Sequence, residues 1–241
     1  MDSSKIHSIR ALPRLAWSGK LPELEFFDIP EDKLVKLRNV LRLRTGDKVC
    51  VLMGNSEVWL CEIEGKGLAV HQKFEMPRVR KRRVRLIQAL PKPEKLDEII
   101  RMGTEIGVDE FILFGSDRSV VKWDEKKWVE KLRRLNSIKN EACEVSFRAE
   151  FPEISVESNL KDCLTKYPHA IVLSEYETVS MDFHTRISQI GPEITLVIGP
   201  EGGWTRTEHE LIGDRAASMG PLVFRVDTAA VAAVSIACLA N

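Results

Sequence analysis

The chain has 241 residues, of which 44% are hydrophobic, and its 36 Lys and Arg balance its 36 Asp and Glu. This composition indicates a globular protein of one or two domains. No apolar run approaches the ~20 residues that a membrane-spanning helix needs, and residues 1–5 carry no apolar segment typical of a secretory signal. We therefore expect a cytoplasmic protein.

The cysteines and histidines point to no disulfide and no metal. The five cysteines are odd in number and scattered, with no C-x-x-C pair, which is typical of small core residues in a reducing compartment. The five histidines show no ligand spacing such as H-E-x-x-H, so we predict no metal site.

Charge is distributed unevenly along the chain. Residues 1–85 carry 18 Lys and Arg against 11 Asp and Glu, whereas residues 86–241 carry 18 against 25. This asymmetry suggests a nucleic-acid-binding module joined to a second region, although a basic solvated face would give the same count.

The first region predicts one helix and several short strands. Residues 31–44 read as the helix, because Leu34, Leu37 and Leu41 recur at helical spacing. Three alternating apolar runs follow, separated by glycine-containing turns, at residues 49–51, 58–60 and 68–70. This pattern predicts a small antiparallel β-barrel.

A basic strip follows, with six Lys or Arg in residues 78–85. Such a run is typical of a solvated linker or edge strand. Beside a basic barrel it is also a candidate for phosphate contacts. We place the domain boundary here, with predicted domains at residues 1–77 and 78–241.

From residue 84 onward, strands alternate with helices. Helices are expected near residues 96–106 and 126–143, and strands at residues 84–90, 111–114, 169–173, 194–198 and 222–224. The alternation predicts a parallel α/β sheet that is covered on both faces. Ligands of such sheets bind at the carboxyl ends of the strands.

Two Gly-Pro loops follow predicted strands. The first is Gly199-Pro200-Glu201-Gly202-Gly203-Trp204, after which Thr205 or Thr207 could cap a helix; the second is Met219-Gly220-Pro221. Two such loops suggest one ligand site that is built mainly from backbone.

The loop chemistry leaves several ligands open. The loops could be ordinary turns, or a phosphate cradle, since backbone N–H groups at a helix start favour anions. The first loop lacks both the P-loop ending and the G-x-G-x-x-G pattern, and Glu201 would repel a phosphate. A carboxylate and free carbonyl groups suit a positively charged ligand, such as the sulfonium of S-adenosylmethionine.

Residues 228–240 are almost all small and apolar, with Asp227 or Thr228 as a possible cap. A helix that is apolar on every side must be buried. A terminal helix of this kind needs a segment that wraps it or a partner that covers it.

Several separate blocks of the sequence resemble the ribosomal RNA uridine-N3 methyltransferase family, RsmE, of the SPOUT methyltransferases. The blocks run through almost the whole chain: Val40–Leu43 with Gly46-Asp47, Ala89–Lys92, Thr104–Val108, Asp117–Lys122, Glu141–Glu144, Ile198–Trp204, Met219–Arg225 and Asp227–Ala229. The resemblance implies an N-terminal PUA-like RNA-binding β-barrel, a SPOUT domain with a C-terminal trefoil knot, and a homodimer.

The resemblance also implies a reaction, the S-adenosylmethionine-dependent methylation of N3 of a uridine in 16S rRNA of the small ribosomal subunit. On it we assign cofactor contacts to Leu173, Gly199, Glu201, Gly202, Met219, Gly220, Leu222, Val223, Phe224, Thr228 and Ala229. Glu201 is the candidate base, with a loop-ordering carboxylate as the alternative, and Arg225 is a candidate partner of the uridine anion. Candidate RNA contacts are Arg42, Arg80, Lys81, Arg82, Arg83, Lys92 and Arg118.

The chain departs from the family pattern at five positions. Val145 stands where Gln is usual, Phe147 where Gly is usual, Leu222 for an Arg, Val226 for a Thr and Asp227 for a Glu. Other readings are a non-enzymatic RNA-binding adaptor, a SPOUT methyltransferase acting on another RNA, and a nucleotide-dependent enzyme. An adaptor would leave the glycine loops without a role, and a nucleotide-dependent enzyme would need the missing P-loop Lys.

Overall fold

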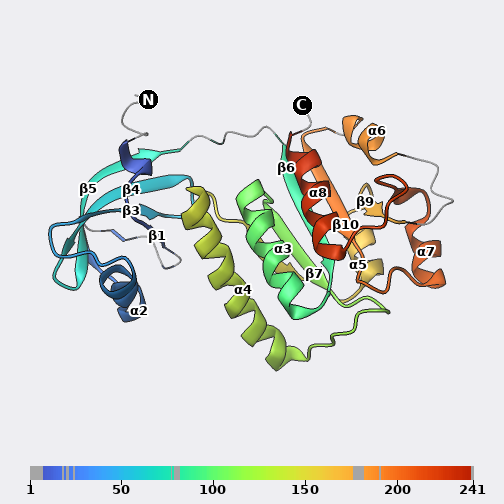
Figure 1. Cartoon of the computed structure of the whole chain (residues 1–241), viewed down its shortest axis with the longest axis horizontal. Coiled ribbons are helices and arrows are strands. Elements are labelled where there is room, and N and C mark those ends of the chain that lie inside the picture. Colours follow the sequence, from blue (N-terminus) through green and yellow to red (C-terminus); the bar gives the residue numbers. More distant parts are fainter. Residues whose placement is uncertain are drawn as a thin grey trace. The chain divides into compact units, whose positions relative to one another are not determined.

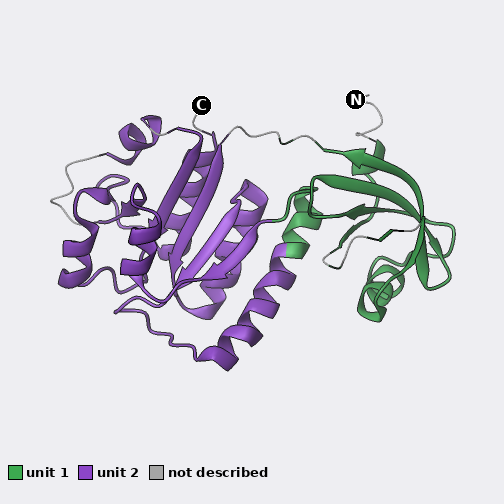
Figure 2. Ribbon diagram, turned by 180° about the vertical axis from the view of Figure 1, so that it is seen from behind, with its two compact units in different colours: residues 1–79, 140–151 green, residues 80–139, 152–241 purple. Residues whose placement is uncertain are grey.

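The computed structural model describes residues 8–17, 19, 22–23, 25–76, 78, 82–175, 182–189 and 191–239. The chain divides into two compact units (Figure 1; Figure 2). Unit 1 comprises residues 1–79 and 140–151, and unit 2 comprises residues 80–139 and 152–241. The helix α4 (Glu125–Ser146) therefore contributes residues to both units.

Unit 1 is built on a five-stranded sheet in the order β1-β3-β4-β5-β2. Its strands are β1 (Arg14–Ala16), β2 (Phe26–Asp28), β3 (Lys48–Leu52), β4 (Glu57–Glu64) and β5 (Gly67–Glu75). The three strands expected from alternating apolar runs are confirmed as β3, β4 and β5, which pair in antiparallel fashion. The expectation of a wholly antiparallel sheet was wrong at β1, which pairs with β3 in parallel.

The predicted helix of unit 1 is shorter than the pattern suggested. It consists of α2 (Glu31–Val35) and a π-helical segment, η1 (Lys36–Val40). Leu37 is fully buried in the core of the unit, which confirms the apolar face. The helix ends early because the Leu41 and Leu43 N–H groups bond to carbonyls five and six residues back, and Arg42 then takes a positive φ of 56°.

Residues 140–151 are tied to the strands of unit 1. Glu144 is 9% exposed, and its carboxylate accepts a 2.8 Å hydrogen bond from Ala16 N and pairs with Lys36 Nζ. Arg14 Nη1 donates to the carbonyls of Glu144 and Val145. A buried carboxylate with these partners is a structural anchor.

Unit 2 contains a six-stranded sheet, and every pairing in it is parallel, in the order β11-β9-β10-β6-β7-β8. Its strands are β6 (Arg83–Ala89), β7 (Glu110–Phe114), β8 (Glu153–Val156), β9 (Ile171–Leu173), β10 (Glu193–Ile198) and β11 (Ala216–Ala217). The predicted parallel α/β sheet is thereby confirmed.

Alternate residues of the strands enter two separate cores, as the twofold period of a strand requires. One face packs on α3 (Pro93–Ile106), α6 (Phe183–Ser188), α8 (Val226–Leu239) and the first part of α4. Figure 1 shows α3 and α8 side by side on that face. The other face packs on α5 (Leu160–Lys166) and α7 (Arg206–Ile212), after which the 3-10 turn η2 (Gly213–Arg215) leads to β11. One face of the last helix is buried by its own chain, since Ala230, Ala233 and Ala237 are at most 1% exposed, whereas Thr228 and Leu239 are exposed.

Two details at the C-terminal end differ from expectation. Residues 222–224 form no strand, because β11 occupies the sheet edge and the chain turns away at Gly220, whose φ is +110°. Leu222 and Val223 are 72% and 75% exposed. The helix α8 begins at Val226, so Asp227 and Thr228 lie in its first turn rather than capping it.

Candidate functional site

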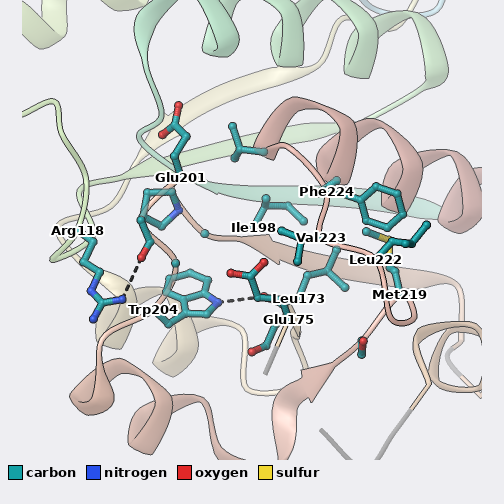
Figure 3. Close-up of a pocket in the computed structure, with 18 of the residues that line it drawn as sticks. Arg118, Leu173, Glu175, Ile198, Glu201, Trp204, Met219, Leu222, Val223 and Phe224 are labelled. Atoms are coloured by element: carbon teal, nitrogen blue, oxygen red, sulfur yellow. Dashed lines mark hydrogen bonds between the residues drawn. The ribbon is translucent and has the colours of Figure 1, made fainter. Parts of the chain in front are cut away.

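An open pocket of about 220 Å³ lies at the carboxyl ends of β9, β10 and β11 (Figure 3). Its walls are the segments that follow these neighbouring strands, the start of α8, and Arg118 from the segment after β7. The carboxyl edge of a parallel sheet is the usual ligand position in such folds.

The pocket brings together the two glycine loops. Ten of the eleven residues predicted as cofactor contacts line it: Leu173, Gly199, Glu201, Gly202, Met219, Gly220, Leu222, Val223, Phe224 and Ala229. Thr228 does not line it and is exposed on the first turn of α8. Arg225 is exposed outside the lining, between Phe224 and the first residue of α8.

The first loop is held in place by Trp204. Its indole Nε1 donates a 2.9 Å hydrogen bond to the Leu173 carbonyl, and its ring stacks on Phe114 with centroids 6.5 Å apart. Within the loop, Gly203 N donates to Pro200 O at 3.0 Å and closes a tight turn, after which Gly203 itself takes a positive φ of +67° that favours glycine. The loop is thus anchored to the ends of β9 and β7.

The helix after this loop starts with a capping box. Thr205, not Thr207, is the N-cap of α7: its hydroxyl accepts from Glu208 N, and Glu208 Oε2 accepts from Thr205 N. Glu208 is only 4% exposed and also accepts a hydrogen bond from Asp117 N. The cap therefore ties the start of α7 to the segment after β7.

Two glycines of the first loop are closely packed. A Cβ on Gly199 would lie 3.1 Å from the Trp204 ring, and a Cβ on Gly202 would lie 3.1 Å from Arg118 Cβ. Arg118 Nη1 also donates a 3.0 Å hydrogen bond to the Gly202 carbonyl. At these two glycines the loop backbone lies so close to neighbouring side chains that a residue with a Cβ would crowd them.

The carboxylate of Glu201 is directed toward α3. Its Oε1 accepts a 3.1 Å hydrogen bond from Lys92 N, at the N-cap of α3, and lies 3.5 Å from Lys95 Nζ. Helix N-termini favour carboxylates in this way. These contacts favour the loop-ordering role over that of a base.

The second loop is short and is held by hydrogen bonds within itself and to the start of α6. Ser218 Oγ accepts a 3.2 Å hydrogen bond from Gly220 N, and the Ser218 carbonyl accepts one from Phe183 N. The apolar residues Leu222, Val223 and Phe224 then form one wall of the pocket (Figure 3).

Sequence reasoning missed several lining residues, among them Ser174, Glu175, Trp204 and Ser218. Glu175 adds a second carboxylate, whose Oε1 lies 3.7 Å from where a Cβ on Gly203 would be. The missed signal was positional, since Ser174 and Glu175 directly follow the predicted strand at residues 169–173 and the carboxyl-end rule applies to that strand too.

The predicted RNA contacts are divided between the two units. Arg42 is an exposed residue of unit 1, whereas Lys92 and Arg118 belong to unit 2, at the N-cap of α3 and in the pocket wall. Arg83 begins β6, and its Nη2 lies 3.9 Å from Glu110 Oε2. Arg82 is described and half-buried, but Arg80 and Lys81 lie outside the described residues.

Within the described parts of the chain, no three His, Cys, Asp or Glu side chains form a group that could hold a metal ion. None of the helices that the structure describes is both long and apolar enough to cross a membrane.

Comparison with known proteins assigns the family. The family model described as RNA methyltransferase domain matches residues 78–238, and the model described as RNA methyltransferase PUA domain matches residues 37–70. A protein of Synechocystis named ribosomal RNA small subunit methyltransferase E is 30% identical, over 83% of this chain and 68% of its own length. The chain belongs to the RsmE family.

Further RsmE proteins and solved structures agree. An RsmE of Bacillus subtilis is 29% identical over 90% of this chain and 91% of its own length. A Legionella pneumophila methyltransferase solved with bound S-adenosylmethionine has a TM-score of 0.85 at 23% identity, covering 94% of this chain and 96% of its own. An RsmE of Neisseria gonorrhoeae, also solved with S-adenosylmethionine, has a TM-score of 0.79 at 22% identity, covering 93% and 95%. The fold is that of the SPOUT RNA methyltransferases with an N-terminal PUA-like domain.

Proposed function

We propose that this protein transfers the methyl group of S-adenosylmethionine to N3 of a uridine in 16S rRNA of the small ribosomal subunit. The observation that carries the proposal is the pocket formed by two glycine loops at the carboxyl edge of the parallel sheet, in a chain of the RsmE family. The names of the relatives support rRNA as the substrate.

The pocket fits S-adenosylmethionine chemically. Leu173, Val223 and Phe224 offer apolar surface for a planar base, and the loop backbone offers hydrogen-bonding groups. Two carboxylates, Glu175 and Glu201, line the pocket and suit a ligand with positive charge. Gly199 and Gly202 keep the backbone accessible, because a Cβ at either position would crowd its neighbours.

When bound, S-adenosylmethionine supplies an electrophilic methyl group. The residues of the chain must exclude water, align the uridine N3 with that group and stabilise the anion that forms when the N3 proton leaves. Alignment of two reactants can contribute about 7–11 kcal/mol. Arg118, which lines the pocket, and Arg225, which is exposed beside it, are the cationic candidates for stabilising the uridine anion or a phosphate.

The RNA is held by basic side chains of the first region together with Arg118 and Lys92. The excess of Lys and Arg in residues 1–85 supports this division, since phosphate contacts require cations. The target base must leave its stack or lie in an irregular region of the RNA.

The protein acts in the cytoplasm as a homodimer. In support, Leu239 at the end of α8 is a large apolar side chain that is 74% exposed and that a partner could cover. Ala233 and Ala237 are buried against the chain's own core, so a large residue there would disturb the fold of α8 before any partner surface. The trefoil knot implied by the family resemblance stays a prediction.

The test is methyl transfer from labelled S-adenosylmethionine to small subunits and to naked 16S rRNA from cells that lack the modification. We expect labelled 3-methyluridine as the product. Binding of S-adenosylmethionine should occur without metal, and ATP should not compete. Tight RNA binding with no cofactor binding would instead identify an adaptor, and label in another RNA would change the substrate.

A further inference from the structure

A second cavity, of about 750 Å³, lies at the other end of the same sheet edge in unit 2. Its walls are the segments that follow β6, β7 and β8, together with residues at the start of α4. The cofactor pocket is at β9, β10 and β11, so the two openings lie side by side along the carboxyl ends of six neighbouring strands.

One wall of this cavity is aromatic. Trp123 and Trp128 contact each other edge to face, with ring centroids 4.8 Å apart, and both are only half-buried. Both line the cavity while packing on the edge of the core. Half-exposed indole rings of this kind are surfaces on which planar ligands stack.

One residue of the lining, Ser116, carries a buried hydroxyl. Ser116 is 7% exposed, and its Oγ makes no hydrogen bond with any residue that the structure describes. A buried polar atom without a hydrogen bond lowers the stability of the fold unless a ligand or a water molecule supplies the missing bond. The neighbouring Gly115 faces open space, since a Cβ there would meet no atom within 4 Å.

Both carboxylates of the lining already have partners, so neither is free to pair with a cationic ligand. The carboxylate of Glu157 is paired with Lys166 Nζ at 2.6 Å, and that of Asp117 accepts a 3.0 Å hydrogen bond from Thr205 Oγ1. Lys122 is exposed and has no ion-pair partner among the described residues, which suits a phosphate near the opening. The lining thus fits a neutral planar group that carries hydrogen-bonding edges, with a phosphate outside.

We propose that this cavity binds a nucleobase of the RNA substrate, one flanking the target uridine, stacked on the Trp123–Trp128 wall and hydrogen-bonded to Ser116 Oγ. The inference rests on the proposed function for the identity of the RNA. The two pockets share the segment after β7, where Ser116 and Asp117 line the second cavity and Arg118 lines the first. Irregular RNA presents splayed bases that aromatic side chains can stack on.

Two probes test the proposal: a fluorescein-labelled octauridylate, followed by anisotropy, and uridine 5′-monophosphate, followed by quenching of tryptophan fluorescence. The variants are Ser116→Ala, Gly115→Val and Trp123→Leu. The control for Ser116→Ala is Ser155→Ala, because Ser155 Oγ is also buried without a partner among the described residues but lies in β8, outside the cavity lining. The control for Gly115→Val is Gly191→Val, because a Cβ on Gly191 would also meet no atom within 4 Å, and Gly191 precedes β10 at the opposite edge of the sheet.

We expect Trp123→Leu to weaken octauridylate binding by about 5- to 100-fold, the range of base–aromatic stacking. Ser116→Ala should weaken it by about 2- to 10-fold without loss of stability, because the hydroxyl has no partner to lose. Gly115→Val should block both probes. The controls, and the affinity for S-adenosylmethionine in every variant, should match the parent.

Unchanged binding of both probes in all three variants, or no binding of either probe to the parent, would overturn the proposal. Loss of mononucleotide binding with unchanged octauridylate binding would make the cavity a free-nucleotide site and also overturn it. Methyl transfer to rRNA is measured separately. If the variants change probe binding but the parent transfers no methyl group to rRNA, the proposed function is refuted and the cavity assignment stands.

Discussion

The indole Nε1 of Trp204 donates a 2.9 Å hydrogen bond to the Leu173 carbonyl, which joins the glycine loop after β10 to the end of β9. Trp204→Phe keeps an aromatic ring but leaves this buried carbonyl without its donor. We expect a loss of about 1–3 kcal/mol in the free energy of unfolding and weaker S-adenosylmethionine binding, measured by denaturant unfolding and calorimetry. Trp59→Phe, which removes a hydrogen bond to Glu57 in unit 1, is the control and should leave cofactor affinity unchanged.

Gly202→Val should abolish cofactor binding, because a side chain there would enter the space between the loop and Arg118. For the parent, S-adenosylmethionine at ~100 times its dissociation constant should add about 2.7 kcal/mol of stability, which thermal melting detects. The variant should melt at one temperature with and without the ligand. Gly191→Val, in open space, should behave as the parent; a ligand-induced shift retained by Gly202→Val would contradict the backbone-lined pocket.

Glu201→Gln distinguishes a loop-ordering carboxylate from a catalytic base. The amide oxygen can still accept the hydrogen bond from Lys92 N, so we expect kcat to fall less than tenfold with an unchanged pH profile. Removal of a general base typically costs about 10²- to 10⁴-fold. A loss of that size in both Glu201→Gln and Glu201→Ala, with cofactor affinity retained, would assign the base to Glu201 instead.

Phe147 occupies a backbone position that suits glycine, with φ of 55°, yet its ring is buried and lies 5.4 Å and 5.2 Å from the Arg10 and Arg14 guanidinium carbons. Loss of a buried Phe side chain costs about 3–5 kcal/mol, and release of left-handed strain returns about 1–2 kcal/mol. We therefore expect the parent to be the most stable protein in urea unfolding, Phe147→Gly to be less stable, and Phe147→Ala to be the least stable. A glycine variant no more stable than the alanine variant would show that the backbone is unstrained.

Three buried thiols predict how stability depends on pH. Burial raises the pKa of Cys50 to about 11 and the pKa values of Cys61 and Cys163 to about 12, above the ordinary value of 9.0. Because the folded state keeps these thiols protonated, the stability they contribute is complete below about pH 9 and is lost as the pH rises toward 11 to 12. Cys61→Ala should reduce the slope of unfolding free energy against pH above 9, measured in urea with a reductant; an unchanged slope would refute the assignment.

The periodic segments of unit 2 were predictable from the sequence because buried parallel strands and amphipathic helices have distinct apolar patterns. The strands predicted at residues 84–90 and 194–198 illustrate this, since they correspond to the central strands β6 and β10. Leu222–Phe224 was mistaken for a strand because a pocket wall and a sheet core call for the same apolar residues. Only the positive φ of Gly220 and the pairing of β11 with β9 separate the two.

The site was predictable where chemistry is concentrated in short loops and not where it depends on contacts distant in sequence. The two glycine loops were recognised directly, but nothing near Glu201 in the sequence indicates that its carboxylate meets Lys92, 109 residues away. Likewise, the sequence offered Thr205 or Thr207 as a cap, but it did not indicate the bond from Asp117 N to Glu208, which spans 91 residues. Local rules predict which groups are present, and tertiary contacts decide which remain free.

The discontinuity of unit 1 affects the order in which a newly synthesised chain can fold. Residues 140–151 complete this unit, and Glu144 bonds to Ala16 across 128 residues. A ribosome making the protein must therefore deliver β6, α3 and β7 of unit 2 before unit 1 can close. A fragment ending at residue 79 would lack the anchor for Arg14 and Lys36, so unit 1 is better isolated with residues 140–151 rejoined by a linker.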